Sequence, residues 1–155
     1  MRIPSRGLIK GKNELLTLFP EVAKEWDSDK NQAFSPDMVT AGSNEKVWWK
    51  CSFGHTWQAL VCSRARGVGC PYCSNRKVLV GYNDLATTHP DIAAEWDYSQ
   101  NGTITPKNIT YGTTKKYWWI CSNGHFYESS VEGRIRGRGC PICCNSHHQH
   151  FIYEK

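Results

Sequence analysis

Cysteine and histidine side chains recur in this chain in two groups that share the same internal spacing. The groups are Cys51, His55, Cys70 and Cys73, and Cys121, His125, Cys140 and Cys143. Three thiolates and one imidazole make a closed tetrahedral set that suits zinc and leaves no coordination position for a catalytic water. The sequence therefore predicts two zinc ions, both with a structural role.

A framework of disulfide bonds is the other use that eight cysteines could have in a short chain. Two features argue against it. A histidine stands at the same place in both groups, and the members of each Cys-Pro-x-Cys pair are too close for an easy mutual bridge. The first residues also lack the hydrophobic stretch of a secretory signal, although a short basic mitochondrial presequence stays open. We expect an intracellular, reducing compartment, with the cytoplasm favoured and an organelle or the nucleus still open.

The offset of 70 residues between the two groups extends through the rest of the sequence. Trp48-Trp49 is matched by Trp118-Trp119, and Pro20-Glu21 by Pro90-Asp91, with no insertion in that register. A constant offset held through loops as well as helices indicates that one folding unit has been duplicated.

This duplication predicts the domain organisation. We expect zinc-finger repeats over residues 1–76 and 77–145, followed by a mobile tail over residues 146–155. A unit of about 70 residues buries little apolar surface, so zinc would act as its staple. Cys62 and Cys144 have no counterpart in the other repeat, and we expect them to be buried or incidental thiols.

The residues around the ligands predict the elements that position them. Pro20 and Pro90 suit a first helical turn and are followed by acidic residues, so we expect short helices over residues 20–27 and 90–97. Each first cysteine ends a stretch rich in aromatic and branched residues. The predicted strand pairs are 46–51 with 56–61, and 116–121 with 126–131.

Glycine completes the expected turn at the metal. Gly54 and Gly124 can adopt the positive φ that turns the chain between paired strands, and the second cysteine pair is expected to open a short helix or a helical turn. The turn at residues 52–54 or 122–124, called the knuckle below, is followed by the return strand of the hairpin and then by ligands at a helix start. This is the order of a treble-clef finger. The predicted fold class is α+β, small and zinc-stabilised: two tandem treble-clef-like fingers, each with a short N-terminal helix, a β-hairpin and a Cys3His site.

Charge divides each repeat into an acidic front and a basic zinc half. Residues 12–41 carry three basic and six acidic residues, whereas residues 42–78 carry six basic and one acidic. The formal net charge of +5 falls to about +3 when six thiolates hold two zinc ions. No apolar run is long enough to span a bilayer, so we expect no membrane partner, and we expect no small-molecule substrate.

The basic zinc halves predict a surface that contacts nucleic acid. The candidate residues are Lys46, Arg64, Arg66, Lys116, Arg134, Arg136 and Arg138. Basic side chains of this kind contact phosphates and supply affinity rather than sequence specificity. Arg64 and Arg66 recur at positions 134 and 136, which makes them the better candidates. The alternative is a solvated basic face that offsets the negative zinc–thiolate centre.

The tryptophan pairs predict one buried and one outward ring in each repeat. Adjacent residues on a strand point to opposite faces, so one member of Trp48-Trp49 should pack beneath the helix that carries Trp26. The outward ring could stack on a base, cover the zinc site or pack against the neighbouring repeat.

Catalysis is not expected. A catalytic metal needs an open coordination position and a nearby acid or base. Glu45 and Glu128 lie near ligands in the sequence, but at unrelated positions of the repeat. We therefore predict that the protein is not an enzyme.

Three strings of the sequence resemble the repeats of a treble-clef zinc-ribbon family of uncharacterised proteins. They are Trp-Trp-x-Cys-x-x-Gly-His, Arg-x-Arg-Gly-x-Gly-Cys-Pro-x-Cys and Leu-Ala-x-x-His-Pro-Asp-x-Ala-x-Glu-Trp-Asp. Members of this family often occur as tandem arrays, sometimes beside nuclease-like domains. The resemblance implies zinc binding and a role in binding nucleic acid or protein.

The predicted function is a non-catalytic module that contacts DNA or RNA through the basic face around its zinc sites, within a larger nucleoprotein assembly. The alternative is a protein-interaction or scaffold module in which the acidic fronts and spare tryptophans dock to a partner. An accessory domain of a nuclease system is a third reading.

Overall fold

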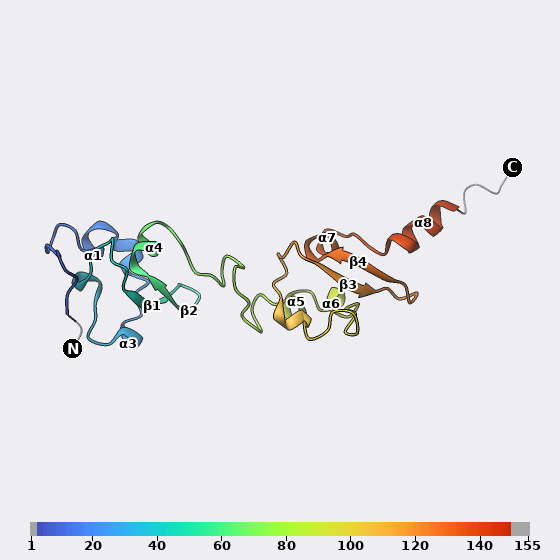
Figure 1. Ribbon diagram of the computed structural model, residues 1–155, viewed down its shortest axis with the longest axis horizontal. Coiled ribbons are helices and arrows are strands. Elements are labelled where there is room, and N and C mark those ends of the chain that lie inside the picture. Colours follow the sequence, from blue (N-terminus) through green and yellow to red (C-terminus); the bar gives the residue numbers. More distant parts are fainter. Residues whose placement is uncertain (1–2, 150–155) are drawn as a thin grey trace. The chain divides into compact units, whose positions relative to one another are not determined.

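The computed structural model describes residues 3–149, and the side chains of residues 3–145. The chain divides into two compact units, Met1–Ser74 and Asn75–Lys155, called unit 1 and unit 2 below. Figure 1 shows the same order of helices, hairpin and helix within each unit. Each unit is described by itself.

Unit 1 consists of a helical front followed by a hairpin and one more helix. Its elements are α1 (Leu15–Leu18), α2 (Pro20–Ala23), α3 (Ser28–Asn31), the 3-10 turn η1 (Pro36–Met38), β1 (Lys46–Lys50), β2 (Thr56–Leu60) and α4 (Val61–Ala65).

Unit 2 repeats this plan with turns at residues 98–100 in place of α3, and it adds a longer terminal helix. Its elements are α5 (Leu85–Thr88), α6 (Pro90–Ala93), the 3-10 turn η2 (Pro106–Asn108), β3 (Lys116–Ile120), β4 (Phe126–Ser130), α7 (Val131–Ile135) and α8 (Pro141–Gln149). The first part of the predicted tail thus continues α8, and residues 150–155 lie outside the described residues.

The hairpins confirm the predicted strand pairs. β1 and β2 are antiparallel and place Trp49 opposite Trp57, while β3 and β4 place Trp119 opposite Tyr127. Each observed strand ends one residue before the predicted end, and the cysteine that follows the first strand of each hairpin is the first zinc ligand.

The predicted helices over residues 20–27 and 90–97 are too long. α2 ends at Ala23, because the chain then runs beside the hairpin and bonds to it: the Asp27 amide donates to the Trp48 carbonyl at 3.1 Å, and the Lys50 amide donates to the Glu25 carbonyl at 2.7 Å. α6 ends in the same way at Ala93.

A second short helix precedes each predicted one and was missed from the sequence. Proline disfavours the helical conformation of the residue before it. Phe19 accordingly has φ −135° and ψ 64°, so α1 and α2 are separate helices rather than one. In unit 2 the Asp84 side chain caps α5 by accepting a bond from the Thr87 amide.

The core of each unit forms around the second tryptophan of the pair. Trp49 and Trp119 are fully buried and meet Trp26 and Trp96 edge-to-face, with ring centroids 5.4 Å and 5.2 Å apart. Edge-to-face pairs of this kind contribute about 1 kcal/mol beyond their burial. Each buried indole N–H also donates to a backbone carbonyl of the partner strand, for example from Trp49 to Ala59 at 3.0 Å. The predicted inward ring is confirmed.

In each unit an asparagine at the start of the acidic front forms hydrogen bonds to the segment that precedes it in the chain. Asn13 accepts from the Ile9 amide and donates to the Gly7 carbonyl, and Asn83 makes the same two bonds to Leu79 and Lys77 at 2.7 and 2.9 Å. Residues 75–81 therefore belong structurally to unit 2. No helix in the described part of the chain is both long and apolar enough to cross a membrane.

Candidate metal centre

The four predicted ligands of unit 1 converge on one point. The His55 Nδ1 atom lies 3.5 Å from the Cys51 sulfur, 3.8 Å from that of Cys70 and 3.3 Å from that of Cys73. The sulfurs of Cys51 and Cys73 are 3.8 Å apart.

The ligands of unit 2 repeat this geometry within 0.1 Å. The His125 Nδ1 atom lies 3.5 Å from the Cys121 sulfur, 3.7 Å from that of Cys140 and 3.3 Å from that of Cys143. The sulfurs of Cys121 and Cys143 are 3.7 Å apart. All four ligand atoms of each group lie within 4.8 Å of one another.

These separations are those of a zinc tetrahedron. With Zn–S bonds of about 2.3 Å and a Zn–N bond of about 2.0 Å, the edges of a tetrahedron measure about 3.8 Å between sulfurs and about 3.5 Å between sulfur and nitrogen. No disulfide links any of the eight cysteines. The groups fit two structural zinc ions, and each closed set of four ligands leaves no position for a substrate.

The knuckle positions the first cysteine and the histidine of each site. The Cys51 amide donates to the His55 carbonyl at 3.1 Å, and the Gly54 amide donates to the Cys51 carbonyl at 2.9 Å. Gly54 has φ +84° and Gly124 has φ +80°, a conformation that side chains with a Cβ rarely adopt. The turn that sequence analysis assigned to these glycines is confirmed.

The thiols of each site differ in their proton affinity. Although burial opposes it, the backbone amides of His125 and Asn123 lower the pKa of the Cys121 thiol to about 7. In unit 1, burial and the neighbouring Cys70 sulfur raise the pKa of Cys73 to about 12. Zinc binds thiolates, so the bound metal would replace the protons that these crowded sulfur atoms otherwise retain.

The sequence of each unit, from its front to beyond the last ligand, matches a known family. The model of a family described as a probable treble clef zinc finger domain matches residues 22–76 and again residues 92–146. The chain belongs to this family. It carries two tandem treble-clef zinc fingers, one in each unit, and the Cys3His groups are their metal sites. A comparison with curated proteins finds no match.

Two of the residues predicted to contact nucleic acid lie inside their fingers. The side chains of Arg64 and Arg134 are 6% and 9% exposed, and their guanidinium groups form ion pairs with the carboxylates of Glu25 and Glu95 in the acidic fronts. We therefore correct their assignment: each arginine joins the zinc half of its finger to the front.

Arg64 is held by contacts on several sides. Its Nη1 atom donates to the Val68 carbonyl at 2.5 Å, and its guanidinium carbon lies 5.2 Å from the Trp49 ring and 5.5 Å from the Trp57 ring. A guanidinium engaged by a carboxylate, a carbonyl and two indole rings has no free face for a phosphate. The sequence did contain a signal for this role, because Glu25 recurs at position 95 just as Arg64 recurs at position 134.

The other predicted contacts are exposed. Lys46, Arg66, Lys116 and Arg138 all lie on the surface and form no ion pair within the described residues. Arg136 is also exposed but pairs with Glu132 at 2.6 Å, one turn earlier in the chain.

The two cysteines outside the metal groups behave differently from each other. Cys62 is buried and its sulfur lies 3.4 Å from the Asn44 side-chain oxygen, whereas Cys144 is exposed at the start of α8. Neither belongs to a metal group.

The two sites differ in what surrounds the ligands. In unit 2 the Asn123 side-chain amide donates to the Cys143 sulfur at 3.2 Å. In unit 1 the matching residue is Phe53, whose ring stacks against the His55 ring with the ring centroids 6.4 Å apart. The sequence pattern did not single out either residue, because this position of the knuckle carries no metal ligand.

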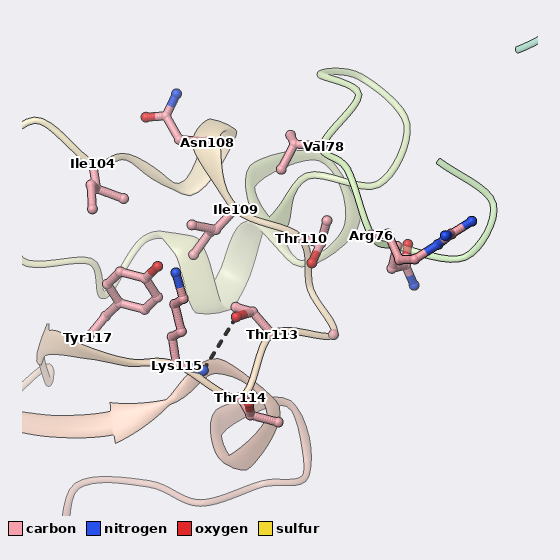
Figure 2. A pocket seen from close by; sticks show the side chains of 12 residues that line it. Arg76, Val78, Ile104, Asn108, Ile109, Thr110, Thr113, Thr114, Lys115 and Tyr117 are labelled. Atoms are coloured by element: carbon pink, nitrogen blue, oxygen red, sulfur yellow. Dashed lines mark hydrogen bonds between the residues drawn. The ribbon is translucent and has the colours of Figure 1, made fainter. Parts of the chain in front are cut away.

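Unit 2 also has a surface hollow that contains no zinc ligand. Its volume is about 530 Å³, and its lining includes Ile104, Ile109, Lys115 and Tyr117. Figure 2 shows the Lys115 side chain pointing into the hollow beside the Tyr117 ring, while Arg76 points away from it. Burial raises the pKa of the Tyr117 hydroxyl. In unit 1, Glu45 stands where unit 2 has Lys115.

Proposed function

We propose that this pair of zinc fingers is a non-catalytic module that binds nucleic acid through exposed cations of its zinc halves, within a larger nucleoprotein assembly. The observation that carries the proposal is the set of unpaired surface cations. Lys46, Lys50 and Arg66 of unit 1 and Lys116 and Arg138 of unit 2 are all free of ion pairs among the described residues.

Part of the acidic charge of the fronts is already paired within them or with the buried arginines. Glu25 and Glu95 form ion pairs with Arg64 and Arg134. Glu21 forms an ion pair with Lys24, three residues later in the same front. Exposed cations that neutralise phosphates release the counterions condensed on the nucleic acid, which gives salt-dependent affinity.

A protein partner is the second candidate, and unit 2 favours it. The outward face of its hairpin carries Trp118, Ile120 and Phe126, and Phe126 is 54% exposed. Apolar side chains gathered on one exposed face are typical of surfaces that dock to proteins.

The nucleic-acid proposal is tested by binding to duplex DNA and to structured RNA over a range of salt concentrations. We expect Arg66→Ala and Arg138→Ala each to weaken binding and to reduce the slope of log K against log salt by about one. Lys24→Ala removes a cation from the acidic front and serves as the matched control, with no change in slope. Zinc content should stay at two in every variant. A wild-type protein that binds no nucleic acid at low salt would overturn the proposal.

A further inference from the structure

The outward face of the unit 1 hairpin combines one aromatic ring with three cations. β1 alternates between exposed and buried residues, so Lys46, Trp48 and Lys50 share the outward face. Lys30 reaches the same face from α3. The six outward residues of β1 and β2 include no acidic side chain, since the remaining three are Thr56, Gln58 and Leu60.

Hydrogen bonds from one side chain hold the backbone of Trp48 in place. The Asn31 side chain accepts from the Trp48 amide at 2.9 Å and donates to the Trp48 carbonyl at 2.8 Å. The Lys30 ammonium lies 4.1 Å from the centre of the Trp48 ring and donates to the Thr56 hydroxyl at 2.7 Å. Lys50 lies opposite Thr56 in the strand register. The ring is therefore in direct contact with the Lys30 ammonium and shares its strand face with Lys46 and Lys50.

Unit 2 keeps the ring of this face but only one of its three cations, Lys116 at the position of Lys46. Asn101 holds the Trp118 backbone by the same two bonds, both at 2.9 Å. However, Gln100 stands in place of Lys30, Ile120 in place of Lys50 and Glu128 in place of Gln58. The scaffold for the ring and the cation at Lys46 or Lys116 are common to both fingers, whereas the cations Lys30 and Lys50 belong to unit 1 alone.

We propose that this face of unit 1 binds single-stranded nucleic acid, with one unpaired base stacked on Trp48 and the flanking phosphates on Lys30, Lys46 and Lys50. The proposal rests on the proposed function and narrows it to one finger and to unpaired strands. Bases in a duplex are stacked on each other, and a ring on a hairpin face reaches a base only when that base is free.

Lys30 does not prevent this binding. A cation–π contact at an exposed site is weaker than the stacking of a base on an indole ring, so a base displaces the ammonium from the ring. The released ammonium stays within reach of the phosphate next to that base. Lys46 and Lys50 lie about 13 Å apart along the strand on either side of Trp48, and they meet the phosphates before and after the stacked base.

The test measures the binding of a fluorescein-labelled thymidine oligonucleotide and of a labelled duplex by fluorescence anisotropy at low salt. Trp48→Ala should weaken binding to the oligonucleotide about tenfold and leave duplex binding unchanged. Trp118→Ala is the matched control and should change oligonucleotide binding less than about twofold. Lys30→Gln with Lys50→Ile introduces the residues of unit 2 and should weaken oligonucleotide binding at least as much as Trp48→Ala.

Each remaining outcome counts against the proposal in a distinct way. Equal losses from Trp48→Ala and Trp118→Ala, or a loss of duplex binding to the same extent, would overturn the assignment to unit 1 and to single strands. If Arg66→Ala weakens duplex binding while Trp48→Ala has no effect on the oligonucleotide, the proposed function stands and this inference fails. If the wild-type protein binds neither probe, both fail. Zinc content and the Trp48→Phe variant, which keeps an aromatic ring and should retain most of the affinity, show that a loss is not caused by unfolding.

Discussion

The two fingers are nearly the same inside and different outside. The ion pair of Arg64 with Glu25 and the buried Trp49 are repeated as Arg134 with Glu95 and Trp119, and the ligand distances agree within 0.1 Å. On the surface, by contrast, Lys30 and Lys50 of unit 1 are replaced by the neutral Gln100 and Ile120 of unit 2. The interior of the repeat therefore specifies the fold, and the differences on its surface are where distinct binding roles can lie.

The chain also leaves the two zinc sites in different ways. After the second cysteine pair of unit 1, Asn75 has φ +56° and ends the helical turns, whereas Asn145 at the matching position lies within α8. The difference has a physical cause in the segment that follows. Residues after Asn75 are bonded to Asn83 of the next front, and this draws the chain out of a helical path.

Loss of one zinc site should have the largest effect, because it should unfold one unit and leave the other folded. In zinc-finger peptides, metal binding contributes about 10–16 kcal/mol to folding, more than the core of a unit of this size supplies. Cys143→Ser should lower the zinc content from two to one and unfold unit 2, while unit 1 keeps the amide signals of a folded protein in a 1H–15N NMR spectrum. Cys73→Ser should give the reverse pattern. Collapse of both units in either variant would contradict the independence of the two fingers.

The next largest effect is expected from the buried ion pairs. Removing one partner of a buried pair costs about 3–5 kcal/mol, and Glu25 is about one-third exposed, so Arg64→Ala should lower the free energy of unfolding of unit 1 by about 3 kcal/mol. Arg134→Ala should cost less, because its guanidinium faces one indole and one phenol ring rather than two indole rings.

Denaturant unfolding with zinc present measures both losses. The surface variant Arg66→Ala is the control and should change the free energy of unfolding by less than about 0.5 kcal/mol. A cost for Arg64→Ala as small as that of the control would show that the arginine does not stabilise the finger.

The knuckle residues should distinguish the metal affinities of the two sites. A hydrogen bond to a ligand sulfur stabilises its thiolate, and loss of such an outer contact lowers metal affinity about tenfold or more. We therefore expect Asn123→Ala to weaken zinc binding by unit 2 about tenfold in competition with a colorimetric chelator. Phe53→Asn should make the site of unit 1 bind zinc more tightly. No change in either variant would mean that the Asn123 amide does not influence the metal.

The smallest expected effect concerns acid stability. The Ser99 hydroxyl, at 2.6 Å, and the backbone amides of Gln100 and Ser99 lower the pKa of the Asp97 carboxyl below its usual value near 4, against the opposing effect of burial. A carboxyl whose pKa is lower in the folded state stabilises the fold above its unfolded pKa. That contribution is lost as the pH falls through the folded pKa.

Asp97→Asn should therefore destabilise unit 2 at neutral pH, and its difference from the wild type should shrink below about pH 4. Unfolding curves at several pH values measure this difference. Asp27→Asn in unit 1 is the matched control with a smaller loss, since Asp27 accepts one bond, from the Lys30 amide at 3.1 Å. A difference that stays constant as the pH falls would contradict this account of Asp97.

The sequence predicted the metal sites well because ligand type and spacing are nearly sufficient to specify a zinc tetrahedron. The hairpins and the buried tryptophans followed from the alternation of side chains along a strand. The sequence did not predict where α2 ends, because that end depends on hydrogen bonds from the Asp27 and Lys50 amides to residues more than 20 positions away. The role of Arg64 was missed for a related reason. Recurrence in both repeats shows that a residue matters, but only its contact with Glu25, 39 residues earlier, shows that it acts in the interior.

X-ray absorption at the zinc edge of the purified protein tests most directly whether each finger holds one zinc ion through three sulfurs and one nitrogen. We expect an average of three sulfur neighbours at about 2.3 Å and one nitrogen neighbour at about 2.0 Å, with two zinc ions per chain. A spectrum with oxygen in place of sulfur, or a protein that retains no zinc, would contradict this expectation.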